Sequence, residues 1–411
     1  MDSRERRHDI DWLRVLGMLM VFLFHCARFF DESDWHVKNT QLSFGMSVFV
    51  AVIAQWMMPL FFTLSAISAY HALSHRDDGQ YIRERFKRLV VPLIFGTLVL
   101  APPQVYVERI SHAQFRGSFI DFLPHYFDGL YGFGGNFAWM GLHLWYLEML
   151  FIFSLLTLPL FRHLWPSPPR AGGHTPTSPL RAGGHTPTSP PRAGGTEGGR
   201  SVFLLAFPLA LVEMAVNLQP NGVGRRDLGR WSPLTYLVFF ILGYLVARDE
   251  RLKISIERNR GAALVTGIIS TGAGFLLLQA GHSPYATPFA WLRALNAWSW
   301  LVAILGLGSR HLSFRSDLLV HANRAVLPFY VLHQTIIVVI GYYAADWSAG
   351  VLVKFVVVAG LSFVAIVAVY ELAIKRSHVL QFLFGMKRSP SAQSRRSDER
   401  DLAQNLARCG E

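Results

Sequence analysis

The sequence predicts an all-α, polytopic membrane protein with about ten transmembrane helices. Hydrophobic residues make up 52% of its 411 residues, whereas charged residues make up only 16%. A soluble domain carries roughly 25% charged residues, so this chain has too little polar surface for a water-soluble globule. The apolar residues also come in long runs, and a run that crosses lipid must satisfy its backbone amides internally, as a helix.

Ten apolar segments are long enough to cross a bilayer, or nearly so. We expect them at residues 10–30, 45–72, 89–107, 143–162, 202–218, 232–247, 261–280, 290–308, 326–345 and 351–374. Pro92, Pro102 and Pro103 lack an amide donor and are expected to kink or shorten the third segment. The first segment is too long for a typical signal peptide and no small-residue cleavage site follows it, so we expect it to be retained.

The basic residues alternate with these segments and predict the orientation of the chain. Most of them fall in connections that are cytoplasmic if the N-terminus is cytoplasmic. They are Arg4, Arg6, Arg7, Arg76, Arg83, Arg85, Lys87, Arg88, Arg248, Arg251, Lys253, Arg258, Arg260, Arg310, Arg315, Arg324, Lys375, Arg376 and those of the tail. The outer connections hold little beyond Lys38, Arg109, Arg116 and a cluster of Arg225, Arg226 and Arg230. The positive-inside rule therefore predicts a multi-pass protein of the plasma (inner) membrane with both termini cytoplasmic.

Two polar stretches interrupt or follow the membrane domain, which we place at residues 1–387. Residues 166–200 repeat a Pro- and Gly-rich unit (PPRAGGHTPTS, PLRAGGHTPTS, PPRAGG), a composition that predicts a disordered loop. His174 and His185 in this loop are isolated imidazoles on a chain expected to be flexible, so we do not expect them to form a metal site. Residues 388–411 are expected to form a disordered cytoplasmic tail.

Several functional classes are disfavoured. The net charge of +12 is spread over loops rather than gathered in a stripe, so we expect no nucleic-acid partner. Cys26 and Cys409 have neither a disulfide framework nor metal-ligand spacing. No GxSxG, Walker, HExxH or CxxC motif occurs, so serine hydrolase, NTPase and zinc-site interpretations have no support.

The first segment carries two ionisable residues, Arg14 and His25, and such residues inside a membrane span are candidates for function. Helical geometry brings them to within roughly 20° of one face and about 16 Å apart along the axis. Asp11, one turn from Arg14, can hold its guanidinium group. An imidazole is well matched to base catalysis at neutral pH. The alternative is that Arg14 extends to lipid headgroups and His25 only bonds to a neighbouring helix.

A basic cluster leads into the third segment. Arg85 and Arg88 lie one helical turn apart, with Arg83 and Lys87 nearby. Guanidinium groups bind phosphate in a bidentate manner, so this cluster suits a phosphorylated ligand such as coenzyme A. The alternative is ordinary positive-inside charge or contact with anionic lipid.

The fourth segment begins with the sequence HLWYLE, which runs from His143 to Glu148. Glu148 lies a turn or more into the lipid and needs a partner, so it can orient an imidazole or stay protonated as an acid. Trp145 suits the interfacial aromatic belt. Three further ionisable residues lie in other spans, and we favour structural hydrogen bonding for two of them, with His333 open to either role. The three are Glu213, His333 and Glu371.

These motifs together resemble the acyltransferase 3 family of membrane-bound acyltransferases. The resemblance runs from about residue 9 to 375, through DIDWLRVLGMLMVFLFH, FFTLSA, RERFKRLVVP, HLWYLEMLF and LPFYVLHQ. An arginine and a histidine with ten residues between them in the first helix are the most specific mark of that family, and Arg14 and His25 reproduce it. Within the family, WHV, HLW and FLFG are similar to members proposed to succinylate periplasmic glucans.

The resemblance implies transfer of an acetyl or succinyl group from cytoplasmic acyl-CoA, a co-substrate rather than a bound cofactor, to a hydroxyl of a glycan or similar acceptor outside. It implies that His25 is the catalytic base and that Arg14, Arg85 and Arg88 bind the donor. The chain departs from the family at Ala66, where many members have glycine, and in the repeat loop, which is an insertion.

The other candidates receive roles as hypotheses. Glu148 would orient the His25 ring, and Trp145 would stabilise the oxyanion as well as contact substrate. The remaining substrate-binding candidates are Asp11, His143 and His333. Arg28, one turn from His25, would suit the carboxylate of a succinyl group.

A transporter or flippase of a lipid-linked sugar or organic acid is the alternative function, because buried charges and many helices suit it as well. The two halves of the chain show no internal duplication, which counts against that alternative.

Overall fold

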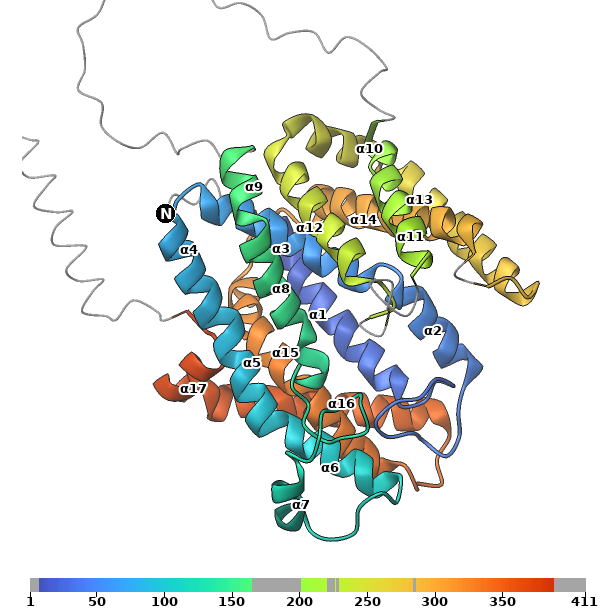
Figure 1. The fold of residues 1–411 in the computed structure, drawn as a ribbon, viewed down its shortest axis with the longest axis vertical. Helices are drawn as coiled ribbons and strands as arrows, with labels where there is room; N and C mark the ends of the chain where they lie inside the picture. Colours follow the sequence, from blue (N-terminus) through green and yellow to red (C-terminus); the bar gives the residue numbers. More distant parts are fainter. Residues whose placement is uncertain (1–6, 165–200, 220–225, 227–228, 284–285, 388–411) are drawn as a thin grey trace, which may run out of the picture.

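The computed structural model describes residues 7–164, 201–219, 226, 229–283 and 286–387 (Figure 1). Regular structure within these residues is helical, apart from one isolated bridge between Leu130 and Phe137. The repeat loop expected at 166–200 and the tail expected at 388–411 lie outside the described residues.

The helices follow the predicted segments in order. They are α1 (His8–Arg28), α2 (Phe44–Ala54), α3 (Met57–Leu73), α4 (Asp78–Arg85), η2 (Phe86–Val90), α5 (Val91–Phe95), η3 (Gly96–Leu100), α6 (Ala101–Ser111), α7 (Phe119–His125), η4 (Leu142–Leu144), α8 (Trp145–Leu156), α9 (Leu158–His163), α10 (Ser201–Leu204), α11 (Ala206–Asn217), α12 (Pro233–Arg248), α13 (Glu250–Gln279), α14 (Thr287–His311), α15 (Asp317–Ala344), α16 (Val351–Leu372), η6 (Ile374–Arg376) and α17 (His378–Leu383).

The all-α polytopic fold is confirmed. Within the described residues, seven helical stretches are long and apolar enough to cross a membrane, and three shorter apolar ones cover 142–156, 202–217 and 233–248. Each of these ten corresponds to one predicted segment. Several begin earlier than predicted because a helix continues beyond its apolar part. The polar start of α13 is an example, where the Asp249 side chain accepts a hydrogen bond from the Arg251 amide at 2.8 Å.

The third segment is longer than predicted. It runs from Asp78 to Ser111 and contains two π-helical stretches, η2 and η3. The first lies just before Pro92 and the second just before the pair Pro102 and Pro103. A π-helical turn accommodates an extra residue within a helix. The helix is therefore locally wider just before these prolines, and it continues through them without being shortened.

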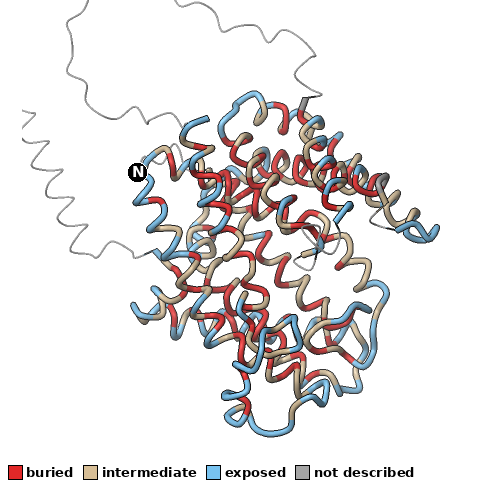
Figure 2. The backbone as a smooth tube through the Cα atoms, viewed as in Figure 1, coloured by how far each residue is buried: buried red, intermediate tan, exposed pale blue. Residues whose placement is uncertain are grey.

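Helix α1 lies in the middle of the bundle, packed against α3, α14, α15 and α16 (Figure 1). Helices α10 to α14 gather on one side of it, and α4 to α9 pass on another. Buried residues line the inner faces of these helices, and exposed residues follow the loops (Figure 2). We call the end where α1 and α4 begin the basic end of the bundle.

The contact between α3 and α12 depends on a glycine. A Cβ atom at Gly243 would lie 2.5 Å from the carbonyl oxygen of Thr63 and 3.0 Å from the Cβ of Ala66. Glycine allows such close approach of two helices inside a membrane. Ala66, which replaces the glycine of many family members, is fully buried here against Gly243.

Gly243→Ala is expected to destabilise the protein by about 1–3 kcal/mol, because the new methyl group overpacks this contact. The measurement is the thermal unfolding midpoint in detergent. The matched control is Gly272→Ala on α13, where an added Cβ meets no atom within 4 Å. Alanine is the better helix former, so the control should unfold at the wild-type temperature or above. Equal midpoints for the two variants would contradict the packing argument.

Candidate active site

A large cavity penetrates the bundle from the basic end. Its volume is about 1910 Å³, and α1, α3, α4, α8 and α15 contribute to its wall. Along α1 the lining residues progress from its N-cap, Arg7, through Asp11 and Arg14 to Val21. The cavity therefore follows α1 into the bundle and ends one helical turn before His25.

The wall of this cavity is rich in positive charge. Its basic residues are Arg7, Arg14, Arg76, Arg85, Arg88, Lys253, Arg324, Lys375 and Lys387, and its acidic residues are Asp11, Glu84 and Glu250. The three arginines that the sequence singled out, Arg14, Arg85 and Arg88, thus share one cavity. Such an excess of cations attracts an anionic ligand.

Arg14 is held between α1 and α3. Its Nη1 lies 3.1 Å from Asp11 Oδ1, the pair expected from their spacing. Its Nη2 donates to the Ser68 hydroxyl and lies 3.4 Å from the Leu64 carbonyl oxygen. These contacts fix the guanidinium group on the cavity wall.

Arg85 and Arg88 lie where α4 passes into η2. The Arg85 guanidinium lies over the Tyr81 ring, 5.0 Å from its centroid. The Arg88 Nη1 lies 3.8 Å from Glu84 Oε1, and the same oxygen lies 3.1 Å from Lys387 Nζ. The Glu84 carboxylate thus lies among three cations, because Arg76 Nε also lies 2.9 Å from its Oε2.

The deepest part of the cavity is uncharged. It is formed by Val21, Met58, Phe61, Tyr146 and Tyr330. The Tyr146 hydroxyl lies 2.6 Å from the Ser65 hydroxyl and donates to the Phe61 carbonyl at 3.2 Å. The cavity wall therefore changes from cationic at the basic end to mostly apolar near His25.

His25 lies just beyond this apolar end, against another histidine. Its Nδ1 lies 2.9 Å from the Val21 carbonyl oxygen and 3.2 Å from the Nε2 of His333 on α15. The Nδ1 of His333 lies 2.6 Å from the Tyr330 carbonyl oxygen. On the other side, the centroid of the Trp35 ring lies 6.3 Å from that of His25.

His143 joins this group from the turn before α8. Its ring centroid lies 4.9 Å from that of His333, in an edge-to-face arrangement. Its Nε2 lies 3.3 Å from the Val331 carbonyl oxygen, and its own carbonyl accepts a bond from the Tyr330 hydroxyl at 2.5 Å. Three histidines from three distant parts of the chain thus lie together.

Glu148 and Trp145 lie apart from the described contacts of His25. The hydrogen bonds described for His25 go to Val21 and His333, not to Glu148, and Glu148 Oε2 is buried with no hydrogen-bond partner among the described residues. The Trp145 ring packs against Tyr236, with their centroids 5.5 Å apart.

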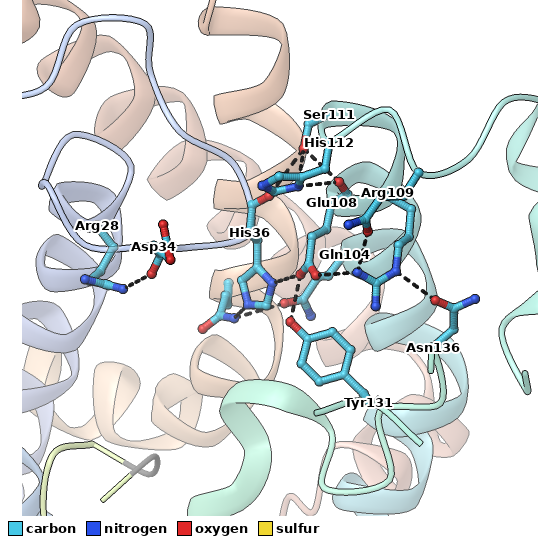
Figure 3. Close-up of polar contacts among 12 residues, drawn as sticks. Arg28, Asp34, His36, Gln104, Glu108, Arg109, Ser111, His112, Tyr131 and Asn136 are labelled. Atoms are coloured by element: carbon cyan, nitrogen blue, oxygen red, sulfur yellow. Dashed lines mark hydrogen bonds and ion pairs between the residues drawn. The ribbon is translucent and has the colours of Figure 1, made fainter. Parts of the chain in front are cut away.

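A second polar network lies at the end opposite the basic end, and the sequence analysis did not identify it (Figure 3). His36 Nδ1 pairs with Glu108 Oε2, and Gln334 Nε2 lies 2.9 Å from His36 Nε2. The Tyr131 hydroxyl donates to Glu108 Oε2 at 2.8 Å. Burial and the Glu108 carboxylate raise the pKa of Tyr131, so its hydroxyl remains a donor. Gln334 follows His333 directly, so this network adjoins the histidine group.

Two members of this network carry a sequence signal of their own. His36 lies in the WHV motif, and Glu108 is a carboxylate at the end of a long apolar segment. The partners Tyr131 and Gln334 carry no charge. Gln334 ends the motif LPFYVLHQ, but that motif does not show which residues it contacts.

Comparisons with known proteins agree with the motifs. The family model described as an acyltransferase domain (acyltransferase 3) matches residues 7–371. The Glucans biosynthesis protein C of Salmonella gallinarum is 24% identical over 403 residues, which cover 95% of this chain and 97% of that protein. Proteins of the same name from Salmonella paratyphi B and Salmonella heidelberg are 24% and 23% identical over 402 residues, with the same coverage. No solved structure matches the chain.

The family model spans both the Arg14–His25 pair and the histidine of α15 that contacts it. The chain belongs to the acyltransferase 3 family, and it is a multi-pass membrane acyltransferase that transfers groups other than amino-acyl groups.

Proposed function

We propose that the protein transfers an acetyl or succinyl group from acyl-CoA to a hydroxyl of a glycan or similar acceptor on the other side of the membrane. The observation that carries this proposal is the single cavity that holds Arg14, Arg85 and Arg88 and ends one helical turn from His25. This geometry supports a path from the arginines, as proposed phosphate ligands, to His25, as the proposed base.

Acyl-CoA matches the gradient of polarity along this cavity. Its phosphates suit the guanidinium groups at the basic end, and its pantetheine arm suits the apolar wall beyond Arg14. Arg14 and His25 are about 16 Å apart along the unbroken α1, a distance of the order that such an arm spans. The volume of about 1910 Å³ exceeds the roughly 300–1,000 Å³ of ordinary ligand pockets, which suits a long donor.

In the proposed reaction, His25 removes the proton of the acceptor hydroxyl while its oxygen attacks the thioester carbonyl. The ester C–O bond forms and the C–S bond breaks. The proton then passes from His25 to the departing thiolate, so the products are free coenzyme A and an O-acyl ester. In this proposal the indole N–H of Trp145 donates to the oxyanion.

The acceptor would arrive from the end that carries His36 and Trp35. The relatives bear the name Glucans biosynthesis protein C, which supports a glucan or a related glycan. The abundance of basic residues at the cavity end supports a cytoplasmic location for that end and for both termini, in the inner membrane. Donor and acceptor would then meet at His25 from opposite sides.

Arg28 does not specifically favour a succinyl group. Its guanidinium pairs with Asp31 and donates to the Asp34 carbonyl at 2.5 Å. Among the described residues, the apolar wall nearest His25 carries no cation for the free carboxylate of a succinyl group. Both donors therefore belong in the assay.

His25→Ala is expected to lower acyl transfer by roughly 10²–10⁴-fold, the usual contribution of a general base. The measurement is thiol release by purified protein in detergent with acetyl- or succinyl-CoA and a glucan acceptor. The control is His125→Ala, an exposed histidine of α7, which should keep wild-type activity. Undiminished transfer by a folded His25→Ala variant would refute the assignment of the base.

Arg85→Gln and Arg88→Gln are expected to raise the KM for acyl-CoA by roughly 10–100-fold, because each removes a charged hydrogen bond to phosphate. Arg88 should lie at the low end, since its side chain is 44% exposed. Arg83→Gln is the matched control, an exposed arginine on the same helix that does not line the cavity. Equal effects of all three substitutions would indicate general surface charge instead of a donor site.

We also propose an acid–base role for Glu148. Its buried Oε2 has no hydrogen-bond partner among the described residues, so no such partner occupies this oxygen. Glu148→Gln preserves the shape and removes the ionisable proton, so kcat should fall about tenfold or more with little change in KM for the donor. A wild-type kcat in this variant would remove Glu148 from the mechanism.

A further inference from the structure

We propose that His333 is a positioning residue, which accepts a hydrogen bond from His25 Nδ1 and thereby directs Nε2 of His25 to the acceptor hydroxyl. This rests on the proposed role of His25 as base. It gives His333 a function different from substrate contact, which its sequence position had suggested.

The geometry determines where the protons lie. A carbonyl oxygen can only accept, so the 2.9 Å contact between His25 Nδ1 and the Val21 carbonyl requires a proton on that nitrogen. The same reasoning applies to His333, whose Nδ1 lies 2.6 Å from the Tyr330 carbonyl. A neutral His333 then has an unprotonated Nε2, which accepts from His25 Nδ1 at 3.2 Å.

This arrangement leaves a single basic atom on each ring. His25 Nδ1–H is shared between the Val21 carbonyl and His333 Nε2, so only Nε2 of His25 has a free lone pair. The Val21 carbonyl lies within α1 and is also the acceptor expected for a backbone amide one turn later. His333 therefore supplies the acceptor that is not shared with the helix ladder.

The bond becomes stronger during the reaction. When His25 Nε2 takes the hydroxyl proton, the ring becomes an imidazolium, and its Nδ1–H bond to His333 becomes charge-assisted. An interaction that strengthens in the transition state raises kcat rather than substrate affinity. His333 itself is fully buried, so the structure gives it no surface with which to contact either substrate.

Two substitutions separate this role from a purely structural one. His333→Leu removes the acceptor, whereas the amide oxygen of His333→Gln can occupy the position of Nε2. We expect His333→Leu to lose roughly 10–100-fold in kcat, the range for a hydrogen bond to a charged group. Its KM for acyl-CoA should stay within about twofold of wild type. His333→Gln should restore kcat to within about fivefold of wild type.

The measurement is steady-state thiol release for wild type, His333→Leu and His333→Gln, with the unfolding midpoint of each to confirm folding. The inference is overturned if folded His333→Leu keeps wild-type kcat, if His333→Gln is as impaired as His333→Leu, or if the defect lies in KM. An error in the proposed role of His25 would give a different result. In that case the thiol release of His25→Ala would match that of wild type, independently of the results for the two His333 variants.

Discussion

The unbroken hydrogen-bond ladder of α1 is the constraint on which the site depends. It fixes both the separation and the relative rotation of Arg14 and His25, since neither can change without breaking backbone bonds that lipid cannot replace. Every other part of the site is arranged along this helix. Helix α3 holds Arg14 through Ser68, and α15 holds His25 through His333.

Ionisable groups within the bundle are stabilised by partners brought from elsewhere in the fold. Glu213 on α11 is fully buried, and its carboxylate lies 3.0 Å from Arg226 and 3.3 Å from Arg293. Because an unpaired buried charge is costly, these arginines have a structural reason to lie at the end opposite the basic end. This pairing explains why Arg226 departs from the positive-inside distribution of basic residues. Its neighbour Arg225 lies outside the described residues.

Local features of the site could be predicted from the sequence, and long-range ones could not. The Asp11–Arg14 pair and the shared face of Arg14 and His25 follow from helical periodicity alone. The contact between His25 and His333 joins residues 308 positions apart, and the His36–Glu108 pair joins residues 72 apart. Such contacts depend on how helices pack. For the same reason the sequence suggested Glu148 as the partner of His25, whereas the fold places His333 there.

The two π-helical stretches of the third segment set its rotational phase. Each accommodates one residue more than an α-helical turn, and one residue turns the remainder of a helix by about 100°. The segment places Arg85 on the cavity wall at one end and Glu108 against His36 at the other. Deleting a single residue from η2 or η3 would leave each end helical but would rotate one relative to the other. The alignment of Arg85 with the cavity and of Glu108 with His36 thus depends on these two π-helical turns, which a count of apolar residues does not reveal.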